Sequence, residues 1–416
     1  MSVAVGVGGV VVMGIKRTGA GVVAAAGAVA LTAAVLSSVP AAAEPTLSPD
    51  APTAIPSPVS TGLPIGPSAD DTSSGTVQCE FQESGDFGRV NSVFAQGDTV
   101  YAATNADGLG ISTDGGQTYT MITKGTKKIK SNSFEDVYAQ GDNVYATSIS
   151  GGHVYMSSDG GGKWNRNRVD GLMGVLGSIS ASGNNVWLGT DRYPRLSTKG
   201  TKNKSWKKKK KGIPFHGRYN LVVFAEGASV YATATSTKKS GGSLFVSTNG
   251  GDSWTPRTTS DGLPNATVDV FAQGDTVYVT PKGANVTAPS FSTDAGNSFS
   301  ALGPASFWND VVGTTRKTSI FAQGDMIYVG TYQGLMISAD GGQSFERVNV
   351  TSPGKSSNEV REVFAVDETV YAATLNGLFI GTCTTVTVPV ASAMVPAAGG
   401  VAGGSPAAIR GRISIW

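Results

Sequence analysis

A phrase of twelve residues recurs seven times along this 416-residue chain and constrains its fold more than any other feature. The copies begin at Val93, Val137, Ile179, Val223, Val270, Ile320 and Val363, and the first reads VFAQGDTVYAAT. Successive starts lie 44, 42, 44, 47, 50 and 43 residues apart, which is near the length of a four-stranded propeller blade. Each copy places a Gly-Asp type turn between two β-rich runs, the signature of a hairpin. The sequence therefore predicts an all-β fold, a seven-bladed β-propeller of four-stranded antiparallel blades.

A second pattern, S-x-D-x-G-x-x-aromatic, follows five of these hairpins about eight residues later. Its third position is occupied by Asp114, Asp159, Asn249, Asp294 and Asp340. A degenerate version, STKGTKNKSW, begins at Ser197. The pattern resembles the Asp-box, or BNR repeat, of sialidase-like β-propellers, and the resemblance covers about residues 79–383. It extends to propellers of the photosystem II stability and assembly factor type, which bind without catalysis.

The resemblance implies a structural role for the box residues, because the Asp-box of the family sits at an outer turn away from the active face. A short polar side chain can hydrogen-bond the amides of its own turn, and glycines allow positive φ. We therefore expect the five box residues to hold turns and not to catalyse a reaction.

The seventh repeat stops at Cys383, where its box should begin. The segment GDFGRVN from Gly85 aligns with QSFERVN from Gln343, which matches Phe87 to Phe345. We therefore expect the N-terminal strand to complete the last blade. The two cysteines of the chain, Cys79 and Cys383, bracket this closure and are predicted to form a disulfide.

The segments that flank the repeats have other compositions. Residues 1–43 carry Lys16 and Arg17 before an Ala/Gly/Val/Leu run and a small-residue cleavage pattern, which predicts a signal peptide, with Met13 as an alternative start. Residues 44–76 are rich in Pro, Ser and Thr and are expected to form a flexible linker. The propeller is assigned to residues 77–384 and a low-complexity tail to 385–416. We expect a secreted, cell-surface or periplasmic monomer with no membrane span after cleavage.

Positive charge is concentrated in the second to fourth repeats. Between Thr120 and Phe245 there are 20 Lys and Arg residues against 7 Asp and Glu residues, although the net charge of the whole chain is +2. The candidate binding residues here are Lys207, Lys208, Lys209, Lys210, Lys211, His216, Arg218, Tyr219, Lys238 and Lys239. One interpretation is a surface for an anionic polymer. The other is edge protection, because lysines on an outer strand prevent sheets from pairing with one another.

The residues that would carry catalysis are sparse. His153 and His216 are the only histidines and lie far apart in the sequence, so neither a zinc site nor a Ser-His-Asp triad is expected, and we predict no metal or cofactor. The Arg-Ile-Pro motif of sialidases does not occur, which argues against a typical sialidase. In the FWND segment, Trp308 could stack on a sugar and Asp310 is the one weak catalytic candidate, although no second carboxylate is identified.

The sequence thus predicts an exported, non-catalytic binding or scaffold propeller. Its expected partner is a glycan, an anionic polymer or a protein, bound at a face built from loops that vary between blades. The alternative is a glycoside hydrolase or lyase of the Asp-box propeller type, which would use Asp310 with an unidentified second acid.

Overall fold

The computed structural model describes residues 2–5, 11–14, 75–126, 128–170, 172, 176–202, 205–214, 221–233, 244–282, 288–308 and 318–387. The chain divides into two compact units, Met1–Ala51 and Pro52–Trp416. In the first unit, β1 (Ser2–Val5) and β2 (Val11–Gly14) pair as an antiparallel hairpin. No helix among the described residues is long and apolar enough to cross a membrane. The predicted signal peptide, linker and tail lie almost entirely outside the described residues and stay predictions.

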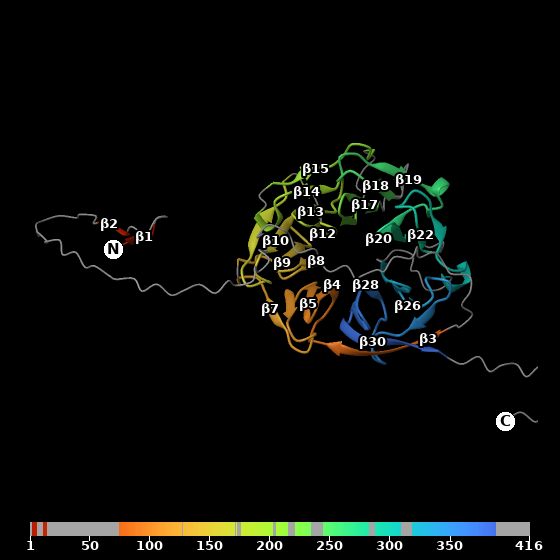
Figure 1. Ribbon diagram of the computed structural model, residues 1–416. Helices are drawn as coiled ribbons and strands as arrows, with labels where there is room; N and C mark the ends of the chain where they lie inside the picture. The colour runs from red at the N-terminus through yellow and green to blue at the C-terminus, as the bar shows by residue number, and fades with distance from the viewer. Residues whose placement is uncertain are drawn as a thin grey trace, which may run out of the picture. The chain divides into compact units, whose positions relative to one another are not determined.

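The second unit contains seven four-stranded antiparallel sheets arranged in a ring, which confirms the predicted seven-bladed propeller (Figure 1). Blade 1 contains β4 (Val90–Gln96), β5 (Thr99–Thr104), β6 (Leu109–Ser112) and β7 (Thr120–Ile122). Blade 2 contains β8 (Phe134–Gln140), β9 (Asn143–Ser148), β10 (His153–Ser157) and β11 (Asn165–Arg168). Blade 3 contains β12 (Ile179–Ser182), β13 (Asn185–Leu188), β14 (Arg195–Ser197) and β15 (Lys207–Lys208), with the short helix η1 (Gly200–Lys202) before β15.

The remaining blades follow the same order. Blade 4 contains β16 (Val223–Glu226), β17 (Ser229–Thr233), β18 (Leu244–Ser247) and β19 (Thr255–Arg257), followed by η2 (Thr259–Asp261). Blade 5 contains β20 (Thr267–Gln273), β21 (Thr276–Pro281), β22 (Ser290–Ser292) and β23 (Ser300–Ala301), followed by η3 (Ala305–Trp308). Blade 6 contains β24 (Ser319–Gln323), β25 (Met326–Thr331), β26 (Gly334–Ser338) and β27 (Glu346–Val348). Blade 7 contains β28 (Val360–Val366), β29 (Thr369–Thr374), β30 (Gly377–Thr387) and β3 (Gly75–Ser84).

The recurrent phrase builds the first two strands of each blade. In blade 1, Gly97 has a φ of 55° in the two-residue turn between β4 and β5, which glycine adopts without strain. Blade 7 has Asp367 at this position, with a φ of 53°. Because the strands of a blade alternate in direction, the first and third turns lie at one end of the sheet, here called the turn face. The connections between β5 and β6 and between blades lie at the other end, here called the loop face.

Six aromatic side chains from the innermost strands form a ring around the propeller axis. They are Phe94, Tyr138, Phe224, Phe271, Phe321 and Phe364. Consecutive ring centroids lie between 4.7 and 5.2 Å apart, in the tilted geometries that aromatic pairs favour. Blade 3 has Ser180 at the equivalent position, and its hydroxyl donates to the Val223 carbonyl oxygen at 3.2 Å. The axis of the ring is therefore packed with aromatic side chains in every blade except the third.

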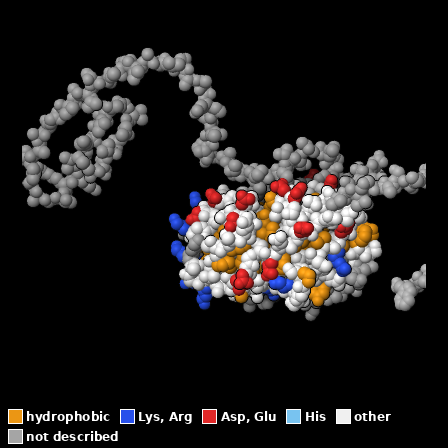
Figure 2. Space-filling view, turned by 90° about the horizontal axis from the view of Figure 1, so that it is seen from below, with side chains coloured by type: hydrophobic (Ala, Val, Ile, Leu, Met, Phe, Trp, Pro, Cys, Tyr) orange, Lys and Arg blue, Asp and Glu red, His pale blue; other side chains and the backbone are white. Residues whose placement is uncertain are grey.

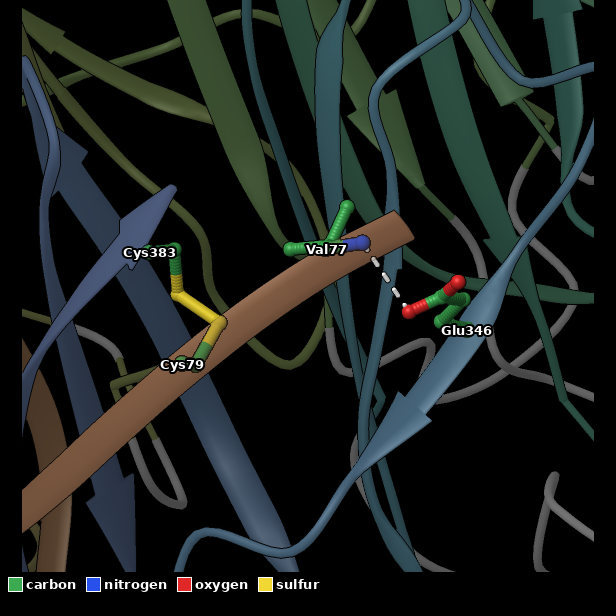
Figure 3. The surroundings of a disulfide bond; sticks show 4 residues. All are labelled: Val77, Cys79, Glu346 and Cys383. Atoms are coloured by element: carbon green, nitrogen blue, oxygen red, sulfur yellow. Dashed lines mark hydrogen bonds between the residues drawn. A yellow bond between two sulfur atoms is a disulfide. The ribbon is translucent and has the colours of Figure 1, made fainter. Parts of the chain in front are cut away.

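Blade 7 combines strands from opposite ends of the propeller sequence. Strand β3 pairs antiparallel with β30 over ten register positions, and the two run side by side at the bottom of Figure 1. Cys79 lies directly opposite Cys383, and the two sulfur atoms are bonded, which confirms the predicted disulfide (Figure 3). The Val77 amide also donates to the Glu346 carboxylate of β27 at 3.0 Å, so β3 is attached to the neighbouring blade as well.

The predicted alignment of Phe87 with Phe345 is wrong. Ile337 of β26 pairs with Glu346, the residue after Phe345, whereas Ile380 of β30 pairs with Gln82, the residue after Phe81. Phe81 therefore occupies the position of Phe345. Phe87 lies between β3 and β4 and packs edge-on against Tyr119 of blade 1, with ring centroids 4.8 Å apart. The shared Arg-Val-Asn triplet misled the alignment, because pairing within the sheet, and not local similarity, sets the register.

Candidate binding surface

The Ser-x-Asp turns hold themselves together through their side chains. In blade 1, the Ser112 hydroxyl donates to Asp114 Oδ1 at 2.6 Å and accepts from the Gly116 amide at 2.8 Å. Asp114 Oδ1 also accepts from the Thr118 amide at 2.9 Å. These bonds, led by the one from Ser112, lower the pKa of Asp114 to about 2. The carboxylate is thus ionised and fully occupied by its own turn.

The same arrangement recurs in blades 2, 4, 5 and 6. Ser157, Ser247, Ser292 and Ser338 each donate to the box residue two positions later, which is Asp159, Asn249, Asp294 or Asp340. The pKa of Asp159 is lowered chiefly by the Lys163 amide, and that of Asp294 chiefly by the Ser292 hydroxyl. The side chains of these four box residues form hydrogen bonds within their own turns, as expected for side chains that stabilise a turn.

The outermost strands of blades 2 and 3 carry exposed positive charge. Strand β11 has the sequence NRNR, with Arg166 and Arg168 exposed, and β15 consists of the exposed residues Lys207 and Lys208. We call these four residues the basic surface. Figure 2 views the ring edge-on and shows several Lys and Arg side chains at one end and a few others farther along, whereas Asp and Glu are spread over the visible face. Because the two blades are consecutive in the ring, the four charges lie on one stretch of the outer wall.

The five lysines from Lys207 to Lys211 differ in exposure and in ion pairing. Lys209 Nζ lies 2.7 Å from Asp252 Oδ1 of blade 4, and its side chain is only 17% exposed. Lys207, Lys208, Lys210 and Lys211 are exposed, and among the described residues none of the four has an ion-pair partner. Lys209 therefore ties blade 3 to blade 4, while its neighbours present their charges to solvent. Edge protection remains compatible with this arrangement, because β15 is a short outer strand.

The sequence prediction missed the arginines of β11, although the NRNR string was visible. In the sheet, His153 is the register partner of Arg168, and Tyr155 is the partner of Arg166. Burial lowers the pKa of His153, and the nearby Arg166 and Arg168 charges lower it further. The His153 imidazole is thus neutral near pH 7, and the positive charge at this site belongs to the arginines.

Trp308, which was predicted to bind, is buried in the structure. Its side chain is 0% exposed, its Nε1 donates to the Leu302 carbonyl oxygen at 2.8 Å, and its ring packs edge-on against Phe345. The large apolar ring packs in the core between blades 5 and 6. His216, Arg218, Tyr219, Lys238, Lys239 and Asp310 lie outside the described residues.

Three carboxylates on the loop face, those of Asp107, Asp191 and Asp261, lie beside structural partners. Asp107 accepts from the Gly88 amide at 3.0 Å, and Asp261 accepts from the Thr258 amide at 2.7 Å as part of a capping box on η2. Asp191 is buried close to Arg195. No group of three or more His, Cys, Asp or Glu side chains suited to a metal occurs in the described part of the chain.

Comparison with known proteins shows the fold alone. No protein-family model and no curated protein sequence matches the chain. A structure of YCF48 bound to D1 peptide is similar with a TM-score of 0.54 and 16% identity, over 74% of this chain and 97% of that one. The GH74 enzyme of Niastella koreensis has a TM-score of 0.51 and 18% identity, over 72% of this chain and 43% of that one. The extracellular domain of a putative hybrid two-component system from B. thetaiotaomicron has a TM-score of 0.52 and 15% identity, over 72% and 41% respectively. The chain is therefore similar in fold to binding proteins, hydrolases and sensor domains alike.

Proposed function

We propose that the chain is an exported, non-catalytic binding propeller that holds an anionic polymer or an acidic protein partner on its basic surface. The observation that carries the proposal is the exposure of Arg166 and Arg168 on β11 and of Lys207 and Lys208 on β15, the outermost strands of two consecutive blades. In the part of the chain that the structure describes, these four cations have no ion-pair partner. Such exposed charges attract polyanions over distances comparable to the Debye length.

Three further findings support this proposal. The box carboxylates bond their own turns, so we propose that the Ser-x-Asp turns are Asp-boxes with a purely structural role. The similar structures include YCF48 bound to a peptide, which is an example of protein binding on this fold. The disulfide and the extracellular propeller domain among the similar structures support export, since disulfides persist in oxidising compartments.

The proposal is tested by retention on immobilised heparin, DNA, polyglutamate and a teichoic-type polymer over a series of salt concentrations. The variant Arg166→Gln/Lys207→Gln should elute at clearly lower salt than the unmodified chain, because each lost cation removes a counterion-releasing contact. The charge control is Arg347→Gln/Lys355→Gln, which removes two positive charges from β27 and from the connection between β27 and β28, where Lys355 is paired with Glu83. Equal retention of the two variants, or no salt-dependent retention of the unmodified chain, contradicts the proposal.

The hydrolase alternative is tested separately, with a panel of chromogenic glycosides. Turnover that Asp310→Asn abolishes would establish the hydrolase. Saturable binding on a glycan array without turnover would instead extend the binding function to uncharged glycans.

A further inference from the structure

The turn face carries a repeated pair of acids that sit beside each other in the fold. Blades 1, 2, 5 and 6 have an aspartate in the first hairpin turn and another in the Ser-x-Asp turn. A backbone bond brings the two turns together: the Gly115 amide donates to the Asp98 carbonyl oxygen at 2.9 Å, and Gly341 donates to Asp325 at 3.0 Å. The turn faces of these four blades are therefore acidic.

Blade 3 keeps the backbone of this arrangement but replaces both acids. Asn184 stands in the hairpin turn and Lys199 stands at the box position, while the Gly200 amide still donates to the Asn184 carbonyl oxygen at 2.9 Å. Lys199 and Lys202 are both exposed. Asn184 and Lys199 thus stand where four other blades have a pair of aspartates, and the turn face of blade 3 is basic instead of acidic.

The altered turns line a pocket of about 420 Å³ between blades 2 and 3, here called the blade-3 pocket. Its lining residues are Asn143, Ser158, Asn184, Lys199, Gly200, Thr201 and Lys202. Gly200 has a φ of 50°, and a Cβ at this position would lie 3.3 Å from Asn184 Oδ1, so a side chain here would crowd the pocket wall. The lining side chains supply two ammonium groups, two hydroxyls and two carboxamides, and none of them is a carboxylate.

We propose that the blade-3 pocket binds a tetrahedral oxyanion, the phosphate or sulfate group of a larger partner. Lysine ammonium groups bind phosphate as point charges, and hydroxyl and carboxamide groups can donate hydrogen bonds to an anion with several acceptor oxygens. Two acids border the pocket without lining it: Asp142 precedes Asn143, and Asp159 follows Ser158. Asp159 Oδ1 accepts from the Ser157 hydroxyl at 2.8 Å and the Lys163 amide at 2.7 Å, which commits it to its own turn.

This inference rests on the proposed function in one respect, since the acidic partner would carry the anion. It adds an anion-binding site on the turn face to the basic surface on the outer wall. In this site Lys199 and Lys202 supply the positive charges that bind the oxyanion. Of the seven box positions, only that of blade 3 holds a lysine, whereas blades 1, 2, 5 and 6 have aspartate and blade 4 has the neutral Asn249. The site can therefore be tested by placing aspartate at position 199.

The test is calorimetric titration of the full chain with inorganic phosphate, inorganic sulfate and acetate. We expect saturable binding of phosphate or sulfate, with acetate clearly weaker. Lys199→Asp restores the box residue and should weaken oxyanion binding by at least about tenfold, because it replaces an attractive charge with a repulsive one. Its thermal midpoint should equal or exceed that of the unmodified chain, since the restored carboxylate can bond its own turn.

The matched control is Asn249→Asp, which restores the box acid in blade 4, away from the pocket, and should leave oxyanion binding unchanged. A preference for phosphate over sulfate assigns the anion to phosphorylated polymers or peptides, and the reverse preference assigns it to sulfated glycans. No saturable binding of either anion, or equal binding by Lys199→Asp, overturns the inference. Polymer retention by the basic surface is measured independently, so polymer binding without oxyanion binding refutes only the blade-3 pocket, whereas the reverse result refutes only the proposed function.

Discussion

Removal of the disulfide should destabilise the propeller through its first and last strands. Cys79 and Cys383 are 304 residues apart, so the bond closes a loop that spans nearly the whole propeller. In the chain-entropy model, a loop of this length contributes about 5 to 6 kcal/mol by restricting the unfolded chain. The ten-position ladder between β3 and β30 remains after the bond is removed, so the ring can still close. Because measured values usually fall below the model, we expect a loss of about 2 to 5 kcal/mol.

The assay is guanidinium unfolding of the oxidised chain and of Cys79→Ala/Cys383→Ala, followed by intrinsic fluorescence and circular dichroism. The variant should show a lower midpoint, and it should not respond to a reducing agent, whereas the unmodified chain should shift toward the variant on reduction. The slope of the transition should also rise, because an uncrosslinked unfolded chain exposes more surface. A difference in the free energy of unfolding below about 0.5 kcal/mol would refute the entropic reasoning, since it lies an order of magnitude under the model value.

Three other perturbations follow from the packing and the charges. Phe364→Ala removes one member of the axial aromatic ring. Because Phe364 is only partly buried, the loss should be about 2 to 3 kcal/mol in a denaturation series, and a cost below about 1 kcal/mol would contradict the close packing of the ring. Trp308→Ala removes a fully buried ring and should cost about 3 to 5 kcal/mol while leaving the salt dependence of polymer retention unchanged, whereas weaker retention by a stably folded variant would support a binding role. Asp114, with a pKa lowered from 3.8 to about 2, should stabilise the fold above about pH 4 and lose that contribution as the pH falls through about 2. Acid unfolding of Asp114→Asn should therefore be less steep between pH 4 and 2, and identical acid transitions would show that the turn bonds do not depend on ionisation.

The repeat architecture was predictable because it follows from local patterns. Each copy of the phrase carries its own hairpin turn between two β-rich runs. Both faces of β5 are buried, since Val100, Tyr101, Ala102 and Ala103 are each at most 3% exposed. The number of copies gives the number of blades, and their spacing gives the length of each blade. Cys79 precedes the first copy and Cys383 follows the last, which predicts a bond between the two ends of the ring. These features require no knowledge of how distant segments meet.

The register in which β3 pairs with β30, and the residues that meet at the candidate sites, depend on contacts between segments far apart in the sequence. Local similarity matched Phe87 to Phe345, but the pairing of β3 with β30 places Phe81 there, since cross-strand contacts outweigh a shared triplet. Trp308 was predicted to stack on a sugar because it is aromatic and lies beside Asp310 in the FWND segment. In the structure its large apolar ring is buried between two blades, which is more favourable than exposure to solvent.

The sequence by itself determined the number of blades, the turns that build them and the disulfide, because each depends on a short pattern or on a pair of unique residues. Only the tertiary structure brought Asn143 and Ser158 of blade 2 to the turns of blade 3 that hold Asn184, Lys199 and Lys202. Each of these residues is an ordinary turn residue on its own. Their convergence in one pocket is set by how two blades pack against each other, and a linear pattern does not encode that packing.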